Sequence, residues 1–127
     1  MFNTGIIGTY DEVKQLIDEE GAYVNYMSRY LDGMTPLSSA VRDEDVCRLL
    51  LDRGANVNIT DMFGVIPLHM ACEKGRDGVV KLLIERGANL HIKEDFDSHT
   101  PLDKAKHNRS NVTVSILENT IKERNGE

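Results

Sequence analysis

The 127-residue sequence contains no tryptophan, and aromatic residues make up only 6% of it. A core of this composition must be built from Leu, Ile, Val, Met and Ala. Cysteine is almost as scarce, because Cys47 and Cys72 are too few for a disulfide framework. No apolar run approaches the roughly 18 residues of a membrane span, and no secretory leader pattern precedes the repeats described below. We therefore expect a cytoplasmic protein with buried thiols and no membrane partner.

Basic residues are the next shortage. The chain has 15 Lys and Arg against 21 Asp and Glu, which gives a net charge of −6. Nucleic acids and anionic membrane surfaces attract clusters of cations. The acidic balance therefore argues against both as partners and permits a basic protein partner. Hydrophobic residues at 40% and charged residues at 28% are typical of a folded chain, and the length suits one domain.

An internal repeat of 33 residues is the strongest positive feature of the sequence. The segments VKQLIDEEGAYVN, VCRLLLDRGANVN and VVKLLIERGANLH begin at Val13, Val46 and Val79. Apolar residues three and four apart in each segment predict an amphipathic helix. A glycine follows each predicted helix at the position of a left-handed cap, namely Gly21, Gly54 and Gly87.

A second element recurs with looser spacing before each of three short helical patterns. It reads Thr35-Pro36-Leu37, Ile66-Pro67-Leu68 and Thr100-Pro101-Leu102. Proline is tolerated in the first turn of a helix, and a preceding threonine can cap that helix. Each unit thus predicts two helices joined by a turn. One unit alone cannot bury both helices, so the period predicts a stacked solenoid.

These motifs resemble the ankyrin repeat, whose pattern is Asp-x-x-Gly-x-Thr-Pro-Leu-His-x-Ala followed by Val-x-Leu-Leu-Leu-x-x-Gly-Ala-x-Val-Asn. The segment DMFGVIPLHMACEKGRDGVVKLLIERGANLH matches nearly throughout, with Ile66 in place of threonine. The resemblance implies an all-α ankyrin-repeat solenoid of helix–turn–helix units with β-hairpin-like loops. We expect one domain over residues 1–127, with a partial repeat at about 3–29, full repeats at about 30–60 and 61–94, and a C-terminal capping repeat at about 95–124.

The loops between ankyrin repeats form fingers that line a concave binding face together with the first helix of each unit. Counting back from each proline places apolar residues at equivalent fingertip positions, Leu31, Met62 and Phe96, and the middle finger adds Phe63 and Val65. Turn tips usually carry small polar residues, whereas interfaces favour Met and aromatic residues. We interpret this row as a binding ridge with an acidic rim. The alternative, that these side chains pack on one another and stiffen the stack, remains open.

The resemblance extends the candidate surface onto the first helices. The predicted partner-binding residues are Leu31, Asp32, Met34, Arg42, Asp43, Met62, Phe63, Val65, Met70, Glu73, Lys74, Phe96, Asp97, His99, His107 and Asn108.

No residue pattern predicts catalysis, since neither a GxSxG motif nor a glycine-rich phosphate loop is present. His69 occupies the Thr-Pro-Leu-His slot, so we expect it to make local structural hydrogen bonds. His99 and His107 could approach Asp95 and Asp97, but HxxxH spacing and a cysteine partner are lacking, and we expect no metal and no cofactor. Glu94 is expected to be solvated.

The sequence therefore predicts a non-enzymatic protein–protein interaction module. We expect a monomer that binds a protein partner, and not nucleic acid or membrane, through its concave finger and inner-helix surface. It would act as an adaptor or a stoichiometric inhibitor. The alternative is a structural or self-associating ankyrin protein that uses the apolar finger ridge for homodimerisation.

Overall fold

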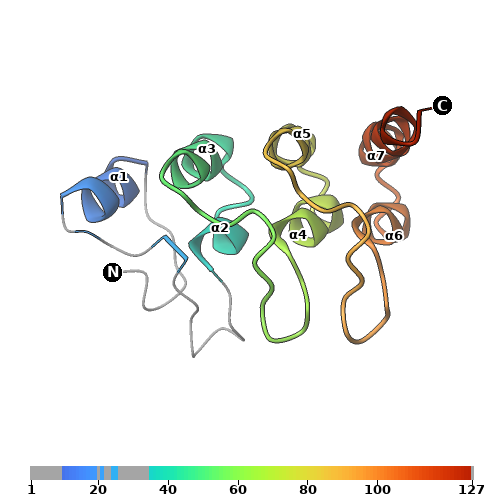
Figure 1. Cartoon of the computed structure of the whole chain (residues 1–127), viewed down its shortest axis with the longest axis horizontal. Coiled ribbons are helices and arrows are strands. Elements are labelled where there is room, and N and C mark those ends of the chain that lie inside the picture. The colour runs from blue at the N-terminus through green and yellow to red at the C-terminus, as the bar shows by residue number, and fades with distance from the viewer. Residues whose placement is uncertain (1–9, 20, 22–23, 26–34, 127) are drawn as a thin grey trace.

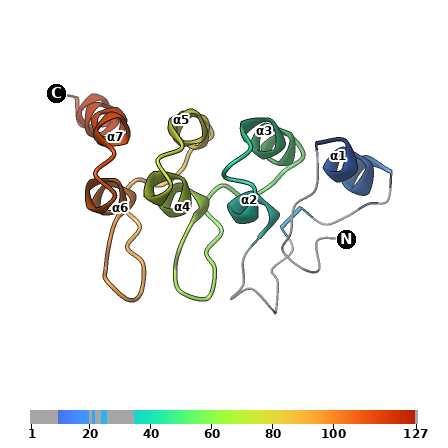
Figure 2. The same ribbon diagram turned by 180° about the vertical axis from the view of Figure 1, so that it is seen from behind.

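The computed structural model describes residues 10–19, 21, 24–25 and 35–126. These ranges contain helices and no strands. The helices are α1 (Tyr10–Asp18), α2 (Pro36–Ser39), α3 (Glu44–Asp52), α4 (Pro67–Glu73), α5 (Asp77–Glu85), α6 (Pro101–His107) and α7 (Asn111–Arg124). Figures 1 and 2 show two parallel rows, with α2, α4 and α6 in one and α1, α3, α5 and α7 in the other. The arrangement confirms the predicted all-α solenoid.

Helix ends follow the expected local chemistry. The Asp43 carboxylate accepts a hydrogen bond of 3.1 Å from the Val46 amide and so caps α3. After α3 and α5 the chain turns through Gly54 at φ +96° and Gly87 at φ +90°, a region that residues with a Cβ avoid. Two glycines of the 33-residue period thus end their helices as predicted.

The first helices α4 and α6 begin with proline but are capped in different ways. Thr100 and Asp103 cap α6 reciprocally, since each side chain accepts from the other residue's amide. Ile66 has no polar side chain, and its amide instead donates to Nδ1 of His69 at 3.1 Å. His69 thus plays the part that Asp103 plays in α6, whereas the part of the Thr100 hydroxyl has no counterpart at Ile66, which makes no side-chain cap hydrogen bond.

The core is aliphatic, as the composition requires. Equivalent residues of α3 and α5, such as Leu50 and Leu83, are fully buried, and each such side chain contributes roughly 1.5–3 kcal/mol of transfer free energy. Cys47 and Cys72 are also fully buried. Burial raises the pKa of both thiols to about 12, so both are protonated, unreactive core residues.

Successive units are joined by an asparagine clamp that repeats with the period. The side-chain oxygen of Asn25 accepts from the Asn56 amide at 2.7 Å, and that of Asn58 accepts from the Asn89 amide at 2.8 Å. The third position of the series is occupied by His91. There the guanidinium of Arg124, at the end of α7, lies 3.5 Å from the carbonyls of Ala88 and Ile84. The last junction is therefore built differently from the first two.

No helix in the described part of the chain has the length and hydrophobicity needed to cross a membrane.

Candidate partner-binding surface

Two described loops project from the row of first helices, away from the second helices (Figure 1). The middle finger, between α3 and α4, is closed by the Asp61 amide, which donates to the Val65 carbonyl at 3.0 Å. The Asp61 carboxylate accepts from the amides of Phe63 and Val65 at 2.8 and 3.0 Å. Gly64 supplies the left-handed turn residue at φ +76°. The tip is thus fixed by local hydrogen bonds.

The last finger, between α5 and α6, is closed by the Glu94 amide, which donates to the His99 carbonyl at 3.0 Å. Ser98 takes the left-handed conformation at φ 55° in place of a glycine. The Asp95 amide donates to the Phe63 carbonyl at 2.9 Å and so joins this finger to the middle one. The two fingers therefore form one connected element.

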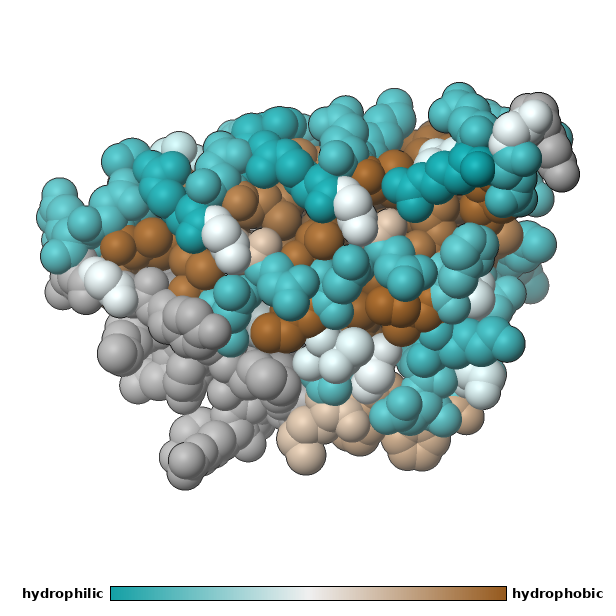
Figure 3. All heavy atoms as spheres, in the orientation of Figure 1, coloured by the Kyte–Doolittle hydropathy of each residue, from teal (hydrophilic) through white to brown (hydrophobic). Residues whose placement is uncertain are grey.

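The finger ends carry Met62, Phe63 and Phe96, which we call the apolar ridge. Their side chains are 66%, 37% and 81% exposed, respectively. The Phe63 and Phe96 ring centroids lie 5.8 Å apart at an interplanar angle of 49°, within the usual range of aromatic pairs. Figure 3 shows apolar side chains gathered at the lower edge of the molecule, where the fingers end. The ridge is thus exposed, and its two aromatic rings also pack on one another.

Of the other predicted residues, Asp97 is exposed beside Phe96 in the last finger, and most of the rest lie apart from the ridge or outside the described residues. Leu31, Asp32 and Met34 are not among the described residues. Val65 and Met70 are half-buried, and Met70 packs against the core. Exposed residues at the carboxyl ends of the first helices and in the turns after them are Arg42, Asp43, Glu73, Lys74, His107 and Asn108. The seven-residue α4 separates its two ends by about 10 Å, so these residues form a second, polar zone.

His69 has the structural role that its motif position predicts, with a longer reach. Its ring is fully buried, and its Nδ1 accepts from Ile66, so Nε2 carries the proton and donates to the carbonyls of Ile92 and His99 at 2.9 and 3.0 Å. Burial lowers the pKa of the imidazole, which favours this neutral form. The middle unit therefore holds both the segment that enters the last finger, at Ile92, and the segment that leaves it, at His99, which the sequence alone did not indicate.

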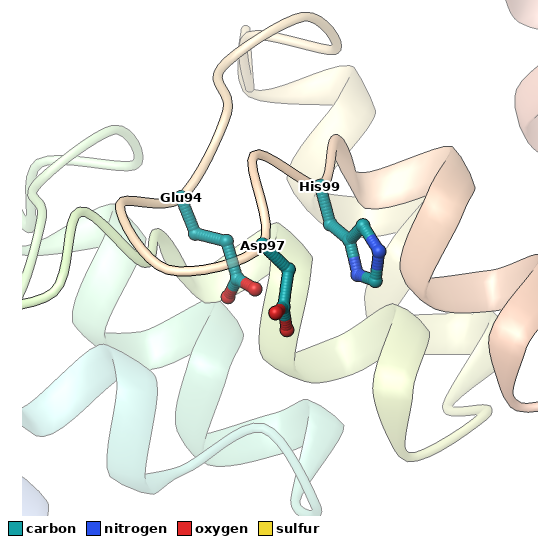
Figure 4. A group of neighbouring side chains, drawn as sticks. All are labelled: Glu94, Asp97 and His99. Carbon is teal, nitrogen blue, oxygen red and sulfur yellow. The ribbon is translucent and has the colours of Figure 1, made fainter.

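The base of the last finger carries a charged group that sequence reasoning missed. Glu94 is only 8% exposed, so the expectation of a solvated carboxylate is wrong. It pairs with the ammonium of Lys104 at 2.9 Å, which explains how a buried charge is tolerated. Asp97 and His99 lie beside it (Figure 4), and the His99 ring lies 6.2 Å from that of His107. The sequence indicated that His99 and His107 could approach Asp97, but it did not indicate the burial of Glu94 or its ion pair with Lys104.

A separate hollow of about 260 Å³ lies between α1 and α3, in the row of helices away from the fingers. It is lined by Tyr10 of α1, by Leu49 and charged side chains of α3, and by Arg53, which directly follows α3. Neither histidine nor cysteine is among its lining residues. The hollow presents neither a nucleophile–base pair nor a thiol.

The stacked helix pairs and projecting loops define a helical repeat solenoid. A family model of ankyrin repeats in three copies matches residues 6–94, and the chain belongs to this family. Over 60 residues, or 46% of the chain, it is 47% identical to Arf-GAP with coiled-coil, ANK repeat and PH domain-containing protein 2 of Gallus gallus. Over 78 residues, or 60% of the chain, it is 33% identical to Alpha-latrocrustotoxin-Lt1a of Latrodectus tredecimguttatus.

The chain matches only 8% and 5% of the length of these two relatives, respectively. The similarity therefore concerns the repeats and not the whole proteins. Ankyrin repeats generally bind other proteins, and the family is typically a non-enzymatic interaction module.

Proposed function

We propose that this chain binds a protein partner through the concave surface formed by its fingers and first helices, as an adaptor or a stoichiometric inhibitor. The apolar ridge is the observation that carries the proposal. Met62 and Phe96 are among the most exposed large apolar side chains in the described part of the chain. Isolated exposed apolar residues need no explanation, but three neighbouring ones at the ends of joined fingers favour an interface.

Contacts between the two fingers preorganise the aromatic side chains of the ridge. The Asp95–Phe63 backbone hydrogen bond and the Phe63–Phe96 ring contact restrain the two aromatic side chains before a partner arrives. Ordering rotamer-rich side chains at an interface costs about 0.5–1.5 kcal/mol each. A restrained aromatic pair avoids part of that cost, and aromatic anchors often dominate binding free energy.

Charge favours a particular kind of partner surface. Asp95 and Asp97 flank Phe96 and are exposed, and the whole chain carries a net charge of −6. A partner that presents an apolar side chain flanked by Lys or Arg would match both features. Such complementarity speeds association and selects partners more than it adds affinity.

The test compares three forms of the full chain: the natural sequence, the double variant Met62→Ala/Phe63→Ala, and Val112→Ala. Val112 is a matched control because it is 62% exposed on α7, in the row of second helices, from which the fingers point away (Figure 1). Proteins captured from source lysate by the natural chain are identified, purified and titrated against each form by calorimetry.

We expect the double variant to lose at least about 2 kcal/mol of binding free energy, or roughly 30-fold in affinity. Its thermal unfolding should stay close to that of the natural chain, and Val112→Ala should bind normally. Equal affinity of all three forms would refute the ridge as the binding surface. An inhibitor would lower the activity of the purified partner at a one-to-one ratio, whereas an adaptor would hold two partners together.

The same exposed ridge gives a second candidate function, pairing with another copy of the chain. A two-fold contact would bury Met62 and Phe96 of both copies. Sedimentation velocity over a range of concentrations distinguishes the two functions. A dimer that dissociates in the double alanine variant would favour self-association, and a monomer at every concentration would exclude it.

A further inference from the structure

Three side chains with metal-binding chemistry meet at the base of the last finger. Glu94, Asp97 and His99 each offer a donor atom, and these atoms all lie within 4.8 Å of one another. Figure 4 shows the side chains leaving one short loop toward the same region. The hydrogen bond of 3.0 Å from the Glu94 amide to the His99 carbonyl fixes the first and last of the three. The loop therefore holds the donors close together before any ligand binds.

The histidine nitrogen in this group is unusual. Nδ1 of His99 has almost no accessible surface and no hydrogen-bond partner among the described residues. Buried polar atoms are nearly always paired, so an unpaired nitrogen beside two carboxylates indicates capacity for a ligand. The ammonium of Lys104 lies 2.9 Å from the Glu94 carboxylate, so this group of side chains already accommodates one positive charge.

We propose that Glu94, Asp97 and His99 form a binding site for a divalent transition-metal ion of the zinc type. One imidazole nitrogen with two carboxylate oxygens is a donor set that zinc accepts, with a fourth position left to water. Zinc bonds of about 2.0–2.2 Å place tetrahedral ligand atoms about 3.4 Å apart. Rotation of the exposed Asp97 side chain can supply the remaining approach. Glu94 would exchange its contact with Lys104 for the metal ion.

The consequence would be local and would not need a partner protein. Phe96 lies between the metal-binding residues in the sequence, so an ion that crosslinks the base of the loop would restrain its tip. The site is thus independent of the proposed function, although it would rigidify one end of the apolar ridge. A titration without partner tests it separately, so its failure would leave the ridge hypothesis untouched.

The first experiment is calorimetric titration of zinc chloride into the full chain and into Asp97→Asn. Asp95→Asn is the matched control, since Asp95 is an exposed carboxylate of the same loop that lies outside the donor set. We expect one zinc ion per chain, a loss of affinity of at least about tenfold in Asp97→Asn, and little change in Asp95→Asn. His99→Ala should lose binding similarly. Thermal unfolding of each variant without zinc verifies that it is folded.

Lys104→Met is expected to strengthen zinc binding, whereas the other variants are expected to weaken it or leave it unchanged. Removing the ammonium removes the cation that competes for Glu94, so zinc should bind more tightly and raise the melting temperature more than in the natural chain. Absence of binding at millimolar zinc would overturn the proposal. Equal losses in Asp95→Asn and Asp97→Asn, or weaker binding in Lys104→Met, would overturn it as well, because the ion would then lie elsewhere.

Discussion

The two described fingers occupy equivalent places in successive units but are stabilised differently. The middle finger holds its own tip, since the Asp61 carboxylate accepts from two amides within the loop. The last finger relies on its neighbour: its Asp95 amide bonds to Phe63, and the carbonyls of Ile92 and His99 accept from His69. The middle finger is held mainly by hydrogen bonds within its own loop, whereas the last finger adds to its own Glu94–His99 bond several contacts with the unit before it.

The two fingers also differ in the residue that occupies the left-handed turn position. A Cβ at Gly64 would lie 2.7 Å from the carboxylate oxygen of Asp95, whereas the equivalent residue of the last finger is Ser98 at φ 55°. The middle finger thus has another finger packed close against it, and no described finger lies beyond the last one. Repeating the same backbone turn therefore does not require repeating the same residue.

The largest loss of unfolding free energy is expected for His69→Ala, because His69 connects two units. The substitution leaves the Ile66 amide and the Ile92 and His99 carbonyls without their partner in a buried site. We expect unfolding free energy to fall by roughly 2–4 kcal/mol in urea denaturation.

Asp103→Ala is the comparison, because Asp103 occupies the equivalent position of the next unit and, among the described residues, forms its side-chain hydrogen bond with Thr100. Loss of this local cap should cost about 1 kcal/mol. Equal losses in the two variants would show that His69 acts only as a local cap. His91→Ala, at an exposed histidine, should leave stability unchanged.

Gly64→Ala should have an intermediate effect. The left-handed backbone at φ +76° costs a residue with a Cβ about 1–2 kcal/mol, and the exposed Asp95 side chain must also turn away. We expect this loss in denaturant unfolding, with smaller changes for alanine at exposed positions outside the fingers. A stability equal to that of the natural chain would mean that the middle finger rearranges freely.

Ser98→Gly should have the smallest effect. It relieves the left-handed strain at Ser98 but also adds conformational freedom to the unfolded chain. The two effects nearly cancel, so we expect a change within about 0.5 kcal/mol. A stabilisation as large as the loss in Gly64→Ala would show that both fingers experience the same environment, contrary to the crowding by Asp95.

Much of the fold could be predicted because its signals are local. The spacing of Val46, Leu49 and Leu50 is enough for an amphipathic helix, and the period requires that such helices stack. The fingertip positions of Met62 and Phe96 also follow from counting back from proline. Burial of Glu94 could not be predicted in this way, since it is accompanied by an ion pair with Lys104 of the following helix, which local spacing does not reveal.

The amino-acid sequence by itself determined the helices, their glycine ends and the order of the stack, because each depends on residues within one turn or one repeat. Tertiary structure alone decided that Phe63 meets Phe96, that His69 reaches the next finger, and that Glu94, Asp97 and His99 lie together. These contacts depend on how far one unit is displaced and rotated relative to the next. Side-chain packing between helices fixes that geometry, and no local spacing encodes it.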